Sequence, residues 1–466
     1  MILWLLAAVA LPAHARPDEG SGSYSFDDSD VLATLDSPNG LVRVTYSADG
    51  PNQVRAGDDD ADGIPDFVKD VALTAEDVLQ VYADAGFAAP LSEEAMGLDP
   101  LGGSYAFDIY LVDFAGVADG WFDTDACMGT RCSGYMAMEN DFRGYGYSSI
   151  DTAIRVLVSH ELFHAVQAAT NTYQPDWMRE GTAVWAEHLY APENEDFLWF
   201  CDSYLDDTSR SLDHPPAGAV TSFTYATALW WDFLVERYGV ESAVALQDAM
   251  QGEDEDAAVE VMASVIASFG GDLTTDWPDF ATWNLATGDR AGSIDSYPFA
   301  AQLNGVTATA EGASIQDLNR FYPLASTYYR LDHPGGPLWF ATLDDPTGIV
   351  FQLHAVADGA ADGPVGEAVL SWDAVTGATE LGDLDAGGYW LVGTYPQIAD
   401  ESVKIDLCLG ADTGIAACEA QDTGATDTGE APKDGTCGCA SARGAGGYGP
   451  LIGLLLLYMR RKSPAS

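Results

Sequence analysis

The feature that most constrains this chain is the segment 149–170, which is largely apolar yet carries His160-Glu161-Leu162-Phe163-His164. Its apolar residues predict a buried helix, and Ser149 can cap the N-terminus of that helix. Residues four apart on a helix lie one above the other, so both imidazoles can bind one metal ion. Buried polar side chains need partners, and a metal would satisfy several of them together.

A catalytic zinc ion takes three protein ligands and keeps one position open. The metzincin pattern would place a histidine at position 170, where this chain has Thr170. A carboxylate on the next helix is the other solution, and Glu180 supplies one. Glu161 stands beside the histidines, where it can take a proton from water. Glu187, on the same predicted helix as Glu180, either orients a ligand or faces solvent.

The segment around Glu180 resembles a known zinc-peptidase family. Its sequence, Trp177-Met178-Arg179-Glu180-Gly181-Thr182-Ala183, is similar to the Trp-Leu-Asn-Glu-Gly-Phe-Ala segment in the aminopeptidase branch of the gluzincins. The gap after His164 is shorter than in that branch, and Arg179 replaces its asparagine. The resemblance implies that zinc is bound by three side chains, His160, His164 and Glu180.

The same family implies an oxyanion donor and a substrate strand. The segment 224–231 resembles the start of a later gluzincin helix, which makes Tyr225 the candidate donor to the oxyanion; a core aromatic is the alternative. We expect the segment 134–140 to be the edge strand beside which an extended peptide lies. Glu139 as a ligand for a free amine would favour an aminopeptidase, but an endopeptidase is favoured here.

A second cation site is predicted in the segment 58–66, where alternating aspartates precede a glycine. The carboxylates are those of Asp58, Asp60, Asp62 and Asp66. Such oxygen ligands suit calcium, and the segment resembles the loops of thrombospondin type-3 and dockerin repeats. Lys69 stands where an EF-hand has its bidentate glutamate. We expect a structural calcium ion, with a solvated acidic turn as the alternative.

Both ends of the chain predict export. Residues 1–15 are apolar and end in a small-x-small pattern typical of a signal peptide, before a polar segment at 16–40. Residues 437–466 contain Cys437-Gly438-Cys439, a short apolar run and a basic tail, and resemble myxobacterial sorting signals. That resemblance implies a sorting protease as partner and membrane contact through this segment alone. We expect the protein at the cell surface, anchored in the outer membrane, or extracellular.

Cysteine spacing and charge fit that location. Two pairs, Cys127 with Cys132 and Cys408 with Cys418, are close enough in sequence for disulfides in an oxidising compartment. Cys201 is left over, as a buried free thiol or an alternative partner. The formal net charge of -54 argues against nucleic-acid binding, which needs clustered basic residues.

The predicted fold is α+β, with a gluzincin-like peptidase domain of a small mixed sheet plus helices at 41–295. A β-sandwich at 320–418 and a flexible linker at 419–436 follow. The order of elements over about residues 40–410 resembles a myxobacterial family of secreted metalloproteases, which implies a protein or peptide substrate. The alternative is a catalytically inactive adhesin or calcium-dependent binding protein at the cell surface.

Overall fold

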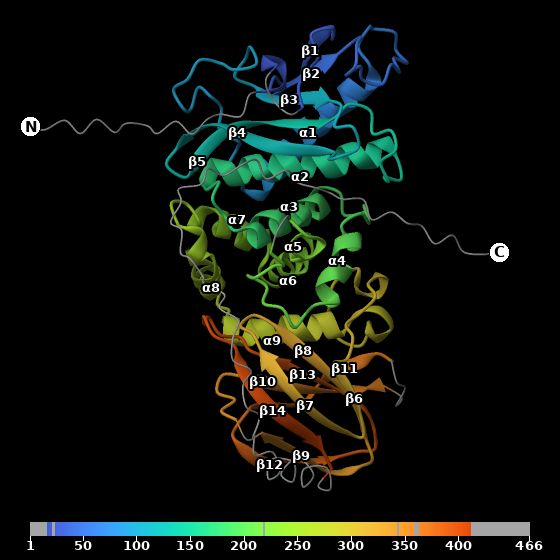
Figure 1. Cartoon of the computed structure of the whole chain (residues 1–466), viewed down its shortest axis with the longest axis vertical. Helices are drawn as coiled ribbons and strands as arrows, with labels where there is room; N and C mark the ends of the chain where they lie inside the picture. Colours follow the sequence, from blue (N-terminus) through green and yellow to red (C-terminus); the bar gives the residue numbers. More distant parts are fainter. Residues whose placement is uncertain (1–15, 21–23, 218–219, 343, 358–362, 412–466) are drawn as a thin grey trace, which may run out of the picture.

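The computed structural model describes residues 16–20, 24–217, 220–342, 344–357 and 363–411. The chain is α+β, as predicted, and Figure 1 shows an N-terminal sheet, a middle layer of helices and a C-terminal pair of sheets along its length. The predicted signal peptide, linker and sorting segment lie outside the described residues. Within these ranges no single helix is long and apolar enough to cross a membrane; by length and composition alone, one bent helix pair, 255–268 with 273–285, meets the test.

The N-terminal sheet has five strands in the order β1-β2-β3-β5-β4. They are β1 (Leu32–Asp36), β2 (Val42–Ser47), β3 (Phe107–Val112), β4 (Gly120–Met128) and β5 (Arg131–Glu139). The strands β2, β3 and β5 run parallel, and β1 and β4 are antiparallel to their neighbours. The polar segment at 16–40 contains a sheet strand, β1.

The prediction that residues 134–140 form the edge strand is wrong. These residues belong to β5, which pairs with β3 on one side and β4 on the other. The strand β4 is not predicted from the sequence; it forms a hairpin with β5 and therefore takes the outer position. Among the described residues, β4 is the outermost strand of the sheet on this side.

Two helices, α1 (Asp66–Ala85) and α2 (Ile150–Thr170), pack beneath this sheet (Figure 1). In α2 nearly every residue from Ala153 onward is buried, so its histidines lie in the interior, as the apolar pattern indicates. The Ser149 hydroxyl accepts a hydrogen bond from the Thr152 amide at 3.0 Å, which confirms the predicted N-cap.

Further helices fill the middle of the molecule. They are α3 (Asp176–Tyr190), α4 (Leu198–Leu205), α5 (Ser222–Ala226), α6 (Ala228–Tyr238), α7 (Val240–Ala249), α8 (Ala258–Ser268) and α9 (Leu273–Leu285). The segment 224–231, expected to begin a single helix, is divided at Thr227 between α5 and α6. The Thr227 hydroxyl donates to the carbonyl of Trp177 in α3 at 2.6 Å, which holds the break against the neighbouring helix.

The C-terminal part consists of two sheets that enclose their own hydrophobic cluster. One sheet has the order β11-β10-β13-β8-β6 and the other β12-β9-β14-β7. Their strands are β6 (Ala310–Gly312), β7 (Ser314–Phe321), β8 (Ser326–His333), β9 (Gly336–Thr342), β10 (Val350–Val356), β11 (Val365–Asp373), β12 (Gly377–Leu384), β13 (Gly387–Thr394) and β14 (Val403–Gly410).

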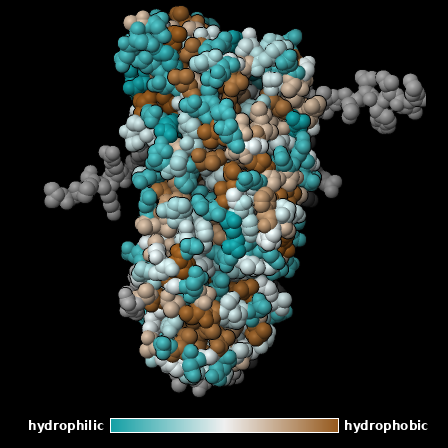
Figure 2. All heavy atoms as spheres, turned by 180° about the vertical axis from the view of Figure 1, so that it is seen from behind, coloured by the Kyte–Doolittle hydropathy of each residue, from teal (hydrophilic) through white to brown (hydrophobic). Residues whose placement is uncertain are grey.

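The sandwich is joined to the helical layer through α9. The Trp277 indole donates to the carbonyl of Ala325 at 3.1 Å, and the Tyr328 hydroxyl donates to that of Ala281 at 2.9 Å. Figure 2 shows the molecule from behind, with hydrophilic surface gathered at its upper end over the N-terminal elements.

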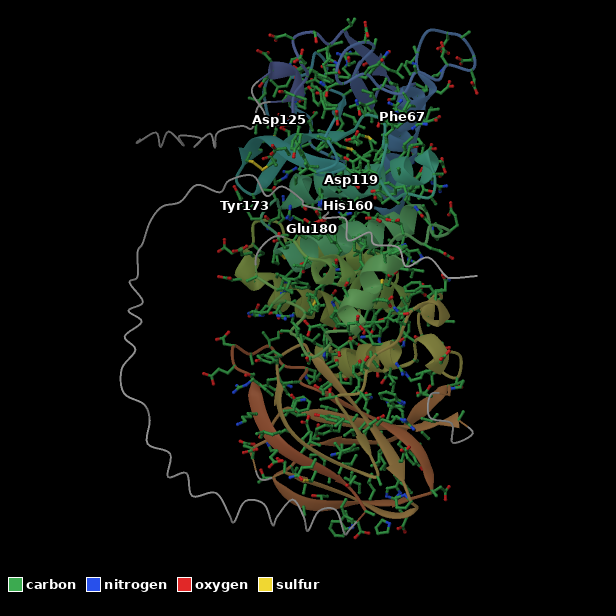
Figure 3. All side chains as sticks on the ribbon, turned by 45° about the vertical axis from the view of Figure 1, so that its right-hand side comes forward. Phe67, Asp119, Asp125, His160, Tyr173 and Glu180 are labelled. Atoms are coloured by element: carbon green, nitrogen blue, oxygen red, sulfur yellow. A yellow bond between two sulfur atoms is a disulfide. The ribbon has the colours of Figure 1, made fainter. Side chains whose placement is uncertain are left out.

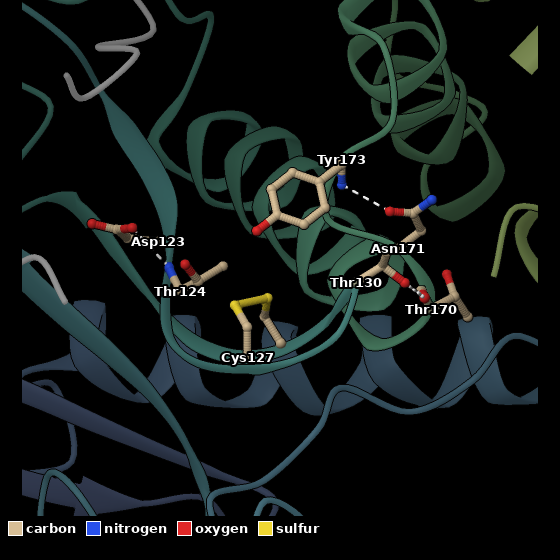
Figure 4. The surroundings of a disulfide bond; sticks show 8 residues. Asp123, Thr124, Cys127, Thr130, Thr170, Asn171 and Tyr173 are labelled. Carbon is tan, nitrogen blue, oxygen red and sulfur yellow. Dashed lines mark hydrogen bonds between the residues drawn. A yellow bond between two sulfur atoms is a disulfide. The ribbon is translucent and has the colours of Figure 1, made fainter. Parts of the chain in front are cut away.

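The predicted disulfide between Cys127 and Cys132 is confirmed, with an S–S distance of 2.03 Å. It closes the β4–β5 hairpin at its tip (Figure 4). Cys201 is a buried free thiol, one of the two states expected for it. Cys408 is also disulfide-bonded, but its predicted partner Cys418 lies outside the described residues.

The first residue after the predicted signal peptide, Arg16, is buried on the far face of the N-terminal sheet. Its guanidinium contacts three carboxylates: Glu93 at 2.7 Å, Asp125 at 2.5 Å and Asp108. The ring of Tyr135 lies 5.2 Å from its central carbon. A single cation therefore pairs with three buried carboxylates that lie 77 to 109 residues after it in the sequence.

Replacing Arg16 should destabilise the N-terminal domain. Removing one partner of a buried ion pair leaves uncompensated charge, and Arg16→Ala is expected to lower the free energy of unfolding by about 3–5 kcal/mol. Urea denaturation would measure the loss. Arg143→Ala is the matched control, because its side chain is 79% exposed, and should change the stability by less than about 0.5 kcal/mol. Equal stability of the two variants would contradict this account of the cluster.

Candidate metal centre

Three donor atoms from two helices meet in the interior. The Nε2 atoms of His160 and His164, both in α2, are 3.1 Å apart. Glu180 Oε2, from α3, lies 3.3 Å from the first and 3.4 Å from the second. Two ligands at zinc's usual bond length and tetrahedral angle are about 3.3 Å apart, so this triangle has the size that one zinc ion requires.

The non-ligating nitrogen of each histidine is also held. Nδ1 of His160 lies 2.7 Å from Glu187 Oε1. Glu187 therefore contacts His160 as expected of a residue that orients a ligand. Nδ1 of His164 lies 2.7 Å from Gln167 Oε1, and the amide nitrogen of Gln167 donates to the Thr182 hydroxyl in α3. Such partners fix the ring orientation and leave Nε2 free for a metal. The role of Gln167 is not predicted from the sequence. Its position one turn after His164 on the same helix nevertheless indicates a contact between the two side chains.

Glu180 is positioned from two sides. Arg179 forms an ion pair with Glu180 Oε1 at 2.9 Å, which leaves Oε2 for the histidines. Gly181 lets α3 approach α6, because a β-carbon there would lie 2.0 Å from Thr227 Oγ1. Close packing therefore explains why a glycine follows Glu180 in this motif. Figure 3 shows Glu180 near His160 and Asp119 in the middle of the molecule.

Glu161 and Tyr225 both line a cleft beside the donor triangle. Burial raises the pKa of Glu161 above its ordinary value. The Tyr225 ring centroid is 5.9 Å from that of His160. Burial, with the charges of Glu180 and Glu161, raises the pKa of Tyr225 well above its ordinary value, so its hydroxyl stays protonated and able to donate. The structure thus brings both predicted catalytic residues to the same cleft.

Glu139, considered as a ligand for a substrate amine, lies elsewhere. Its carboxylate accepts hydrogen bonds from the Phe114 amide at 2.9 Å and the Tyr145 hydroxyl at 3.0 Å. The cleft wall in this region is instead formed by Asp119 and the first residues of β4. The hypothesis that Glu139 holds an amine therefore finds no support in the geometry.

The aspartates of the segment 58–66 gather around the ammonium group of Lys69. Its Nζ atom lies 2.7 Å from Asp60, 3.2 Å from Asp62, 3.3 Å from Asp66 and 3.9 Å from Asp58. Three of the four, Asp58, Asp60 and Asp66, have oxygens close enough together to hold a cation. A calcium ion would have to displace the lysine, so the predicted calcium site competes with an internal cation.

No protein-family model matches the chain, and no curated protein matches it. Among solved structures it is similar to Aeromonas hydrophila PliG, a periplasmic lysozyme inhibitor of g-type lysozyme, with 20% sequence identity and a TM-score of 0.17. That match covers 21% of this chain and 85% of the other. A likeness at this TM-score carries no argument about fold or function.

Removing the Gln167 side chain, which orients the His164 imidazole, should weaken zinc binding. In Gln167→Ala the imidazole loses the group that orients it, and we expect the zinc affinity to fall roughly 10–100-fold. Titration against a chelator of known affinity would measure it. Gln80→Ala, on the exposed face of α1, is the matched control and should bind zinc like the wild type. Unchanged affinity in Gln167→Ala would show that His164 is held without this contact.

Removing the internal cation should reveal whether the aspartate loop binds calcium. In Lys69→Met the loop keeps its carboxylates and loses the competing charge, so we expect calcium affinity to rise roughly tenfold or more. Isothermal titration calorimetry would measure the change, with Lys404→Met in β14 as the exposed control. If neither the wild type nor Lys69→Met binds calcium, the loop is a solvated acidic turn held by its lysine.

Proposed function

We propose that this protein is an exported zinc-dependent peptidase with a gluzincin-type ligand set, His160, His164 and Glu180. The observation that carries the proposal is the donor triangle, with separations of 3.1–3.4 Å, on buried side chains that are each oriented by a further partner. The zinc ion would supply the acidity that lets coordinated water act as a nucleophile near neutral pH and would polarise the substrate carbonyl.

The chain's own residues would move the proton and stabilise developing charge. Glu161 is buried beside both histidines in the cleft wall, where it would accept the proton of the attacking water and pass it to the leaving amine. Tyr225 would donate its hydroxyl hydrogen to the oxyanion, which is strongest in a site that excludes water. Both roles need side chains facing one cleft, and the two residues meet that requirement.

The free edge of β4 favours an extended peptide substrate and an endopeptidase. Gly120, Trp121 and Phe122, at the start of β4, line the cleft that contains Glu161. An extended peptide can pair with the backbone of an edge strand, which would lay its bonds across the centre. Glu139, the carboxylate considered as an anchor for a free amine, does not line the cleft, and this favours internal cleavage.

Activity against denatured casein would test the proposal. Zinc-loaded protein should cleave casein, a chelator should stop it, and Glu161→Gln should lower kcat by roughly 100-fold or more because the proton acceptor is lost. Glu236→Gln, exposed on α6, is the matched control and should retain activity. Absence of cleavage by the zinc-loaded wild type, indistinguishable from Glu161→Gln, would instead favour an inactive binding protein on this fold.

A further inference from the structure

The cleft beside the candidate metal centre carries more negative charge than that centre uses. Three of its carboxylates serve the proposed reaction, and two others do not. The five are Asp119, Glu161, Glu180, Glu187 and Asp196. Asp119 directly precedes β4, and Asp196 directly precedes the residue that caps α4. Neither belongs to the ligand set, so their presence in the cleft needs another explanation.

The basic residue that lines the cleft, Arg179, does not neutralise this pair. Its guanidinium is 2.7 Å from Asp176 and 2.9 Å from Glu180, so its charge is already engaged. Asp119 is 5% exposed and accepts a hydrogen bond from the neutral hydroxyl of Tyr147. Among the described residues, none donates a hydrogen bond to the Asp196 side chain.

A third carboxylate that lines the cleft also has an oxygen without a hydrogen-bond donor among the described residues. Glu187 is 6% exposed, and while its Oε1 holds His160, its buried Oε2 has no hydrogen-bond partner in the described part of the chain. Burial, together with the charge of Asp119, raises the pKa of Asp196 to about 6. Carboxylates that line one cleft without a cation between them are unfavourable, and a positively charged ligand would relieve them.

We infer that Asp119 and Asp196 form a subsite for a positively charged side chain, lysine or arginine, of a peptide bound in the cleft. The inference rests on the proposed function, whose substrate class it specifies. A peptide lying along β4 would start beside Asp119, because that residue is adjacent to the strand. Trp121 and Phe200, which also line the cleft, can cover the aliphatic stem of such a side chain while its charged end meets the carboxylates.

Matched peptides would test the subsite. N-acetylated, internally quenched peptides would carry lysine or norleucine at each position around the cleaved bond, so that the charge differs and a free terminal amine is absent. At one position kcat/KM should be roughly tenfold or more higher for lysine than for norleucine. Asp196→Asn should bring this ratio close to one, while Asp206→Asn, exposed at the end of α4, should leave it unchanged. Thermal unfolding would verify that both variants fold.

Two outcomes would overturn the inference and leave the peptidase standing. One is equal cleavage of the lysine and norleucine peptides by the wild type, and the other is a lysine preference that survives Asp196→Asn. Failure of the proposed function would differ, because the zinc-loaded wild type would cleave neither peptide. Fluorescence anisotropy with zinc-loaded Glu161→Gln would then measure peptide binding without cleavage. Equal affinity for the lysine and norleucine peptides would overturn the subsite. A preference for lysine that is lost when Asp196→Asn is added would support it.

Discussion

The close contact between α3 and α6 at Gly181 determines where the third donor of the metal centre lies. Protein interiors are close-packed, so a side chain at this position would push the two helices apart. Thr227 occupies the space that a β-carbon would need, and its hydroxyl is bonded to the carbonyl of Trp177 at the start of α3. Because Glu180 directly precedes Gly181, any such displacement would move its carboxylate away from the imidazoles of α2. A donor triangle with sides near 3 Å tolerates little of that movement.

The buried polar groups around the triangle explain why it can exist before a metal binds. Each donor residue has its other polar atom engaged: His160 with Glu187, His164 with Gln167, and Glu180 with Arg179. These contacts offset part of the cost of burying the side chains and hold them in the ligating orientation. Metal binding to such a preformed set stabilises the folded state, because the unfolded chain has no equivalent site.

Local sequence patterns were sufficient to predict the helices that carry the candidate metal centre. They did not reveal contacts between residues that are distant in sequence. The two histidines and Glu180 were found because helical periodicity and short motifs are encoded within a few residues. The cluster around Arg16 joins residues 77 to 109 positions away, which no periodicity reveals. The outer strand β4 was missed for a related reason. Its side chains are mostly half-buried on both faces, so it lacks the alternation of apolar and polar residues by which a strand is predicted.

The strand β4 is also the element that connects the N-terminal sheet to the candidate metal centre. A β-carbon on Gly120 would lie 2.9 Å from the side chain of Leu157, so β4 begins in direct contact with α2, one turn before His160. This contact brings Asp119, the residue before β4, into the wall of the cleft that contains the donor triangle. One close approach of strand to helix therefore sets both the backbone edge that an extended peptide can use and the carboxylate that would select its charge. A side chain at residue 120 would disturb the two together, whereas Asp196, which lies between α3 and α4, can be changed alone.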